Sequence, residues 1–263
     1  MGVVDFHNHV IPGVDDGAQE SAQSVAAIES LIADGVSVLV ATPHFDASRT
    51  LDGAALQQRM SELDDGWQRL RACSAAFPEV RIERGAELAL DVPEPDLSDA
   101  RLRLGGGTFF LMEFPFMTVP PQSPRVIEAI TAQGYTPIIA HPERYSGFQA
   151  HLDLAAEWRE NGALLQVNGG SLLGRYGRDA RNNASELLAR GWVDYLASDY
   201  HARGPCLVAQ YRGLLEEADA GELAQTLMET NPLRMLEGLR PIPVPPLRQK
   251  RTLWGRVSAI FGS

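Results

Sequence analysis

The sequence predicts an α/β protein in which parallel strands alternate with helices and close into a barrel. At least seven short apolar runs are separated by segments with helical spacing, and no glycine-rich dinucleotide turn follows the first run. The 263 residues are 44% hydrophobic and 22% charged, which suits a folded unit with a sizeable core. We therefore expect a single barrel domain over residues 1–240.

The predicted strands are short runs enriched in β-branched and aromatic residues. They cover residues 3–6, 36–41, 80–90, 109–114, 136–140, 164–167 and 193–197. Segments with apolar residues at helical spacing lie between most of these runs. The predicted helices cover residues 21–34, 51–76, 124–133, 152–161 and 180–190. Residues 92–107, with prolines and a glycine triplet, are expected to form a loop.

The last 23 residues differ from the rest of the chain. Residues 241–246 read Pro-Ile-Pro-Val-Pro-Pro, which predicts an extended linker. Residues 248–261 combine basic side chains with apolar residues that share one face of a helix. Such a basic amphipathic helix can lie on an anionic membrane, and the alternative is a tail that is disordered or packed on the barrel.

Charge and cysteine content restrict the classes of function. A formal net charge of −11 disfavours nucleic-acid binding. Two cysteines argue against a fold based on a disulfide framework, and the first residues do not resemble a signal peptide. We expect a cytoplasmic location, with peripheral contact at the inner face of the membrane through 248–261. A homo-oligomer is compatible with the sequence.

Five of the six histidines stand directly after predicted strands. They are His7, His9, His44, His141 and His201. An isolated His-x-His pair is about as often structural as functional. The prediction of a functional site therefore rests on the position that all five histidines share. Because the carboxyl ends of parallel strands meet at one rim of a barrel, we expect these imidazoles to lie together.

Three carboxylates, Glu87, Glu113 and Asp199, also end predicted strands. Burying acids at strand ends is costly without a counter-charge, and metal ions supply one. Imidazole and carboxylate ligands together suit Mn, Fe or Zn. Eight candidate ligands are too many for one ion, so the sequence predicts a cluster of two or three divalent or trivalent ions that could activate water and bind a phosphoryl group.

The motifs around these residues resemble the PHP (polymerase and histidinol phosphatase) superfamily, and within it the bacterial capsular and exopolysaccharide tyrosine-protein phosphatase branch. The resemblance covers about residues 1–237. It rests on DFHNHVIPGVDDGA (5–18), ATPH (41–44), GAEL (85–88), EFP (113–115), AHPERY (140–145) and SDYH (198–201).

The resemblance implies a distorted (β/α)7 barrel with a trinuclear metal centre at the strand ends. The metal expected first is Mn, and Fe or Zn are the alternatives. Glu87 is expected to bridge two ions. The implied ligands are His7, His9, His44, Glu87, Glu113, His141, Asp199 and His201.

The resemblance also implies catalytic roles for Asp199 and His201 and a substrate-phosphate site at Arg144, with Arg203 as a second candidate in the last loop. A guanidinium matches phosphate oxygens, which supports Arg144 independently. Asp15 and Asp16 either hold the first loop or simply form an Asp-Gly turn.

The implied activity is hydrolysis of phosphotyrosine by direct attack of a metal-bridging hydroxide. The implied partner is the phosphorylated C-terminal tail of a bacterial tyrosine kinase that regulates capsular or exopolysaccharide synthesis. A sibling activity, histidinol phosphate hydrolysis, uses the same kind of centre. A protein of another class, a non-catalytic kinase-binding adaptor, would keep the barrel without turnover.

Two other hydrolase classes fit the sequence less well. A cysteine phosphatase uses Cys-x5-Arg, which Cys206 and Arg212 match, but the residues between them look helical and contain no glycine to cradle a phosphate. Amidohydrolases that open with His-x-His often bridge their metals with a modified lysine. The single lysine, Lys250, lies in the tail, so that variety is excluded.

Overall fold

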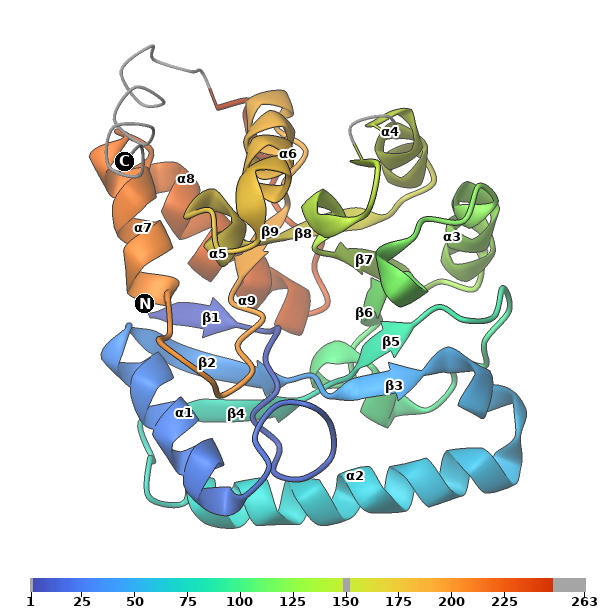
Figure 1. The fold of residues 1–263 in the computed structure, drawn as a ribbon. Coiled ribbons are helices and arrows are strands. Elements are labelled where there is room, and N and C mark those ends of the chain that lie inside the picture. Colours follow the sequence, from blue (N-terminus) through green and yellow to red (C-terminus); the bar gives the residue numbers. More distant parts are fainter. Residues whose placement is uncertain (1, 149–151, 248–263) are drawn as a thin grey trace.

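The computed structural model describes residues 2–148 and 152–247 (Figure 1). The histidine that follows no strand, His151, and the predicted membrane-binding segment 248–261 lie outside the described residues. No described helix is both long enough and apolar enough to cross a membrane.

In the part of the chain that the structure describes, nine parallel strands form two sheets, which confirms the predicted α/β class. The first sheet has the order β1-β2-β4, with β1 Val3–Asp5, β2 Val36–Ala41 and β4 Arg81–Arg84. The second has the order β3-β5-β6-β7-β8-β9. Its strands are β3 His44–Asp46, β5 Glu87–Ala89, β6 Phe109–Glu113, β7 Thr136–Ala140, β8 Leu164–Asn168 and β9 Tyr195–Ala197.

The two sheets are one distorted barrel of seven strand positions, in which the second and third positions are interrupted. Pro43 separates β2 from β3, and Gly85 separates β4 from β5, so the strand expected over 80–90 is two short strands. The loop after β1 enters at this break, where the Thr42 backbone N–H donates to the Asn8 carbonyl. The last strand closes on the first through loops, because the Asp199 N–H donates to the His7 carbonyl.

Helices surround the sheets (Figure 1). The expected ones are α1 Ser21–Ala33, α2 Gly53–Ser74, α3 Ser123–Ala132, α4 Leu152–Glu160 and α6 Gly177–Arg190. The sequence did not predict α5 Gly169–Leu172, α8 Gly221–Gln225, the π-helix Thr226–Thr230 and α9 Asn231–Leu236. Of α7 Val208–Glu217 it indicated only the first turn, within residues 207–211. Short 3-10 turns are η1 Ala47–Leu51, η2 Ala100–Leu102, η3 Leu104–Gly106, η4 Pro115–Met117 and η5 Pro142–Arg144.

Alternate strand residues belong to two apolar clusters, as the period of two requires. Val40, Leu111 and Ile138, from three strands, belong to a small cluster inside the barrel. Their sequence neighbours, such as Leu39 and Ile139, join the larger cluster beneath the helices. This alternation continues to the carboxyl ends of the strands. The last inward-facing side chains of the strands therefore lie together at one rim of the barrel.

The proline-rich segment has no regular secondary structure where it is described, up to Leu247. The Ile242 N–H donates to the Asn231 side chain, and the Leu247 N–H donates to the Leu188 carbonyl. Residues 241–247 therefore lie against the barrel, while the domain boundary at residue 240 stays a prediction.

Candidate metal centre

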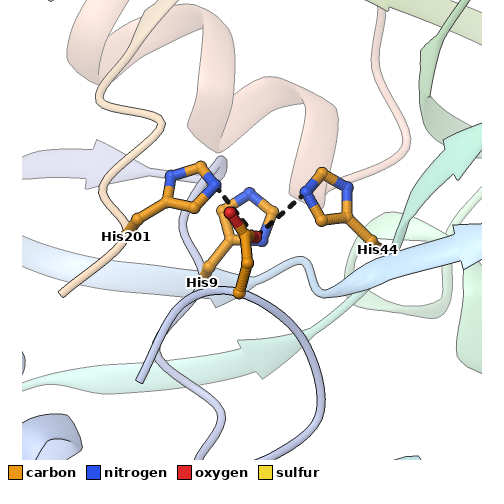
Figure 2. A group of neighbouring side chains, drawn as sticks. His9, His44 and His201 are labelled. Carbon is orange, nitrogen blue, oxygen red and sulfur yellow. Dashed lines mark ion pairs between the residues drawn. The ribbon is translucent and has the colours of Figure 1, made fainter. Parts of the chain in front are cut away.

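All five strand-end histidines lie together at the carboxyl-end rim. Figure 2 shows the imidazoles of His9, His44 and His201 converging on one point. The centroids of His9 and His201 are 4.0 Å apart and those of His9 and His44 are 4.4 Å apart. His7 lies 5.6 Å from His9 and 5.5 Å from His141, measured between ring centroids. The tertiary structure therefore makes one cluster of five histidines from four separate chain segments.

The carboxylate of Glu87, which is fully buried, lies at the centre of this cluster. Its Oε1 is 3.1 Å from His7 Nε2 and 3.0 Å from His141 Nε2. Its Oε2 is 3.1 Å from His44 Nδ1 and 3.4 Å from His9 Nε2. Burial alone would raise the pKa of Glu87, but the imidazoles around it hold that pKa well below its usual value. Each of its two oxygens thus faces two histidines, which is the arrangement expected of a carboxylate that bridges two metal ions.

The other two predicted acids flank Glu87. Asp199 Oδ1 lies 3.4 Å from His7 Nε2, 3.5 Å from His9 Nε2 and 3.4 Å from His201 Nδ1. Glu113 Oε1 lies 3.5 Å from His44 Nδ1. Burial and the nearby charge of Glu87 raise the pKa of Glu113 to about 7. A cation bound between Glu87 and Glu113 would relieve this repulsion.

Four overlapping groups of side chains have ligand atoms close enough to share an ion. They are His7, His141 and Asp199; His7, His9 and Glu87; His44, Glu87 and Glu113; and His9, Asp16, His44 and His201. Every ligand predicted from the sequence belongs to at least one of these groups, and their role as ligands remains a prediction.

Several buried polar atoms in the cluster have no hydrogen-bond partner among residues 2–148 and 152–247, although buried polar atoms are normally paired. They are His7 Nε2, His9 Nε2, Glu87 Oε2 and His141 Nδ1. Imidazole nitrogens and carboxylate oxygens left in this state fit divalent metal ions such as Mn, Fe or Zn. The residues present therefore match the group that the sequence predicted.

The backbone is strained at two of these positions. His141 has φ 35° and Asp199 has φ 52°, in the left-handed region that non-glycine residues rarely adopt. Strain of this kind costs on the order of 1–3 kcal/mol per residue and is found at functional sites. At both positions the conformation turns the chain directly after a strand and directs the side chain into the cluster.

The structure gives separate roles to Asp15 and Asp16, whose function the sequence left open. Asp15 Oδ2 accepts a hydrogen bond from His9 Nδ1 at 2.9 Å, and its Oδ1 accepts one from the Gly17 N–H. Asp15 thus orients a candidate ligand and also forms the Asp-Gly turn. Asp16 Oδ1 lies 3.4 Å from His44 Nε2 and 3.3 Å from His201 Nε2, which adds a candidate ligand that the sequence did not predict.

A cavity of about 390 Å³ opens beside the cluster, and both predicted arginines line it. Arg144 Nη1 donates to Asp199 Oδ2 at 2.5 Å, and the guanidinium carbon lies 4.2 Å from the Tyr176 ring centroid. Arg203, whose side chain is 62% exposed, pairs with Asp16. Arg144 is therefore held rigidly at the cavity wall, whereas Arg203 lies at its outer edge.

Sequence reasoning missed Tyr176 at this cavity and two buried polar residues of β8, Gln166 and Asn168. Gln166 Oε1 lies 2.8 Å from His7 Nδ1, and Asn168 Nδ2 donates to Asp199 Oδ2 at 2.8 Å. The sequence feature that could have identified Gln166 and Asn168 was the presence of two amides at alternate positions in an otherwise apolar strand.

The competing cysteine motif does not form a site. The Cys206 side chain is buried, and burial raises the pKa of its thiol far above the usual value. Arg212 pairs with Glu216 and Glu229. No loop that could cradle a phosphate separates the two residues, because α7 begins at Val208.

The fold and the cluster define a class, a metal-dependent α/β barrel hydrolase with several candidate ligand groups at its strand ends. Residues 3–237 match the family model described as capsular polysaccharide synthesis, CpsB/CapC. The chain belongs to this family, as the resemblance predicted.

Relatives and a solved structure agree. The tyrosine-protein phosphatase YwqE of Bacillus subtilis is 28% identical over 200 residues, covering 76% of this chain and 77% of the relative. The tyrosine-protein phosphatase CpsB of Streptococcus pneumoniae is 25% identical, covering 89% of this chain and 98% of the relative. One chain from the crystal structures of YwqE and CpsB, described as unique metal-dependent tyrosine phosphatases, matches with a TM-score of 0.73 and 27% identity. That match covers 94% of this chain and 100% of the other.

Proposed function

We propose that this chain, a metal-dependent tyrosine-protein phosphatase of the CpsB/CapC family, hydrolyses phosphotyrosine by direct attack of water on phosphorus. The observation that carries the proposal is the buried cluster of five histidines and three carboxylates with Arg144 fixed beside it. A phosphate monoester is a dianion, and the metal ions that the cluster would hold and the arginine would together balance its charge.

The residues of the cluster supply positions for two or three metal ions. When bound, such ions lower the pKa of water towards neutrality and neutralise charge on the phosphoryl oxygens. Glu87 would be shared between neighbouring ions, because each of its oxygens faces two histidines. Asp15 keeps His9 in one orientation, with Nδ1 donating to the carboxylate and Nε2 directed into the cluster.

The remaining steps belong to side chains at the cavity. Arg144 would bind the equatorial phosphoryl oxygens, since its guanidinium is already aligned by Asp199 and Tyr176. Tyrosinate leaves with a pKa of about 10, so it needs little protonation in the transition state. His201 belongs to one of the candidate ligand groups, so a catalytic role for it would be to hold a metal ion at the cavity.

The partner we propose is the phosphorylated C-terminal tail of a bacterial tyrosine kinase that controls capsule or exopolysaccharide synthesis. The support is the family, whose description is capsular polysaccharide synthesis. The open cavity beside Arg144 is compatible with a peptide segment rather than a deeply enclosed small molecule. Peripheral membrane contact through residues 248–261 would bring the enzyme near a membrane-bound kinase.

The test is hydrolysis of a phosphotyrosine peptide and of histidinol phosphate by the purified protein, together with elemental analysis. We expect turnover that a chelator abolishes and Mn²⁺ restores, and a kcat/KM for the peptide at least about 10-fold above that for histidinol phosphate. A preference for histidinol phosphate would show the sibling activity. A protein that holds its metals and hydrolyses neither compound would be the adaptor.

A further inference from the structure

Two buried amides on β8 connect His7 to Asp199. Gln166 Oε1 lies 2.8 Å from His7 Nδ1, and Gln166 Nε2 donates to Asn168 Oδ1 at 2.9 Å. Asn168 Nδ2 then donates to Asp199 Oδ2 at 2.8 Å. Gln166 and Asn168 follow Leu164, which belongs to the interior cluster, at alternate positions, so they continue the interior row of β8 towards the rim.

Asp199, at the end of this series of hydrogen bonds, determines which group donates and which accepts in each of them. A carboxylate only accepts, and Asp199 Oδ2 also accepts from Arg144 Nη1 at 2.5 Å. The Asn168 amide must therefore present its nitrogen to Asp199 and its oxygen to Gln166. Gln166 must present its nitrogen to Asn168 and its oxygen to His7. The proton of a neutral His7 must then be on Nδ1, which leaves the lone pair on Nε2.

The backbone of Asn168 is held by further hydrogen bonds in the protein interior. The Asn168 backbone N–H donates to Glu143 Oε1 at 3.0 Å, and Ser171 Oγ donates to the same oxygen at 2.7 Å. Asn183 Nδ2 donates to the Glu143 carbonyl at 3.0 Å. Gln166, Asn168 and His7 are fully buried, so water does not compete for these bonds. These bonds fix the backbone at Asn168, whereas the orientation of the two side-chain amides follows from Asp199.

We propose that Gln166 and Asn168 are positioning residues that select one tautomer of His7 and divide the two oxygens of Asp199 between protein and metal. Asp199 Oδ2 is committed to Asn168 and Arg144, so Oδ1 is left for the cluster, 3.4 Å from His7 Nε2. His7, His141 and Asp199 form one of the candidate ligand groups. This inference rests on the metal-dependent function proposed above.

The same logic applies to His9, but with a different partner. His9 Nδ1 donates to the carboxylate of Asp15, whereas His7 Nδ1 donates to a neutral amide. A carboxylate partner makes an imidazole a stronger donor to metal than an amide does. The two histidines of the His-x-His motif are therefore expected to bind ions with unequal strength, although both use Nε2.

The test is Gln166→Met, which removes the amide but keeps an unbranched side chain of similar length. The probe is Zn²⁺, which is diamagnetic, titrated into metal-free protein. Loss of a partner to a metal-binding histidine costs roughly 10–100-fold in affinity, so we expect one class of Zn²⁺ sites to weaken by that factor. Asn231→Leu is the control, because it removes an equally buried amide that bonds to the Asp194 and Ile242 carbonyls and not to the cluster. Its Zn²⁺ affinity should not change.

The second measurement is made on the wild-type protein, with one variant used only to assign the signal. In protein labelled with ¹⁵N-histidine and loaded with Zn²⁺, the His7 ring, identified by its loss in His7→Gln, should carry its proton on Nδ1. A proton on Nε2 would overturn the proposal, as would a Gln166→Met protein whose Zn²⁺ affinities match the wild type. Failure to hydrolyse phosphotyrosine would refute the proposed substrate and leave these two results standing. Failure of the wild type to bind Zn²⁺ would refute both.

Discussion

Arg144 offers the sharpest test of the proposed phosphate site. Its guanidinium is held by Asp199 at 2.5 Å and by the Tyr176 ring at 4.2 Å before any substrate arrives. The rotamer entropy of an arginine, about 2 kcal/mol, is therefore lost on folding and not at the transition state. Removing one preorganised donor to developing charge costs about 2.7–4 kcal/mol, or about 10²–10³-fold in rate. We expect Arg144→Met to lower kcat/KM for a phosphotyrosine peptide by that factor.

Two companion variants separate charge from geometry. Arg144→Lys keeps the charge but loses the planar fork and the stacking, so we expect a loss of about 10-fold. Tyr176→Leu removes only the stacking, worth about 0.5–2 kcal/mol, and should cost less than Arg144→Met. The assay is steady-state hydrolysis in Mn²⁺, with metal content measured for each protein. The reasoning is refuted if Arg144→Met retains its metals and its kcat/KM stays within about 3-fold of the wild type.

Three further expectations concern other parts of the chain. Cys206→Ser should keep wild-type turnover, because the thiol is buried and its pKa is raised. Loss of activity in a variant that still holds its metals would instead favour a mechanism with Cys206 as the nucleophile. Gly17→Ala should reduce peptide hydrolysis and metal content, because a Cβ there would lie 2.0 Å from the His9 carbonyl oxygen. Gly213→Ala, where a Cβ meets nothing within 4 Å, is its control, and equal behaviour of the two would contradict the argument. Trp158→Ala should lower the free energy of unfolding by about 3–5 kcal/mol in urea titrations, because the side chain is fully buried; a loss below about 1 kcal/mol would mean that the core collapses around the gap.

The sequence by itself determined the fold class and the identity of the cluster. Apolar runs at regular spacing predicted parallel strands, and the polar residues directly after them, such as His7, Glu87 and Asp199, had to meet at one rim. This inference needed only the period of each strand and the rule that parallel strands share an orientation. The family followed from the same residues and their neighbours, and the family match over residues 3–237 confirmed it.

The interruptions in the barrel were less accessible. Residues 80–90 read as one apolar strand, yet the strand divides at Gly85, where Pro43 of the neighbouring strand has no N–H to donate. The N–H groups of Gly85 and Glu87 still donate to the Ala41 and Pro43 carbonyls, so the register is kept across the break. The helices after Val208 carry weaker periodicity, and their packing against the barrel stabilises them more than their own propensity does.

Only the tertiary structure decided which side chains orient the candidate ligands. Gln166 lies 159 residues from His7, and Asn168 lies 31 residues from Asp199, so no local pattern relates the partners. Asp15 is close to His9 in sequence, but its second oxygen also completes a turn, and either role alone would explain an Asp-Gly pair. Periodicity fixes the face on which a residue lies. A hydrogen bond depends on the distance and direction between two atoms, and these exist only once distant segments have packed together.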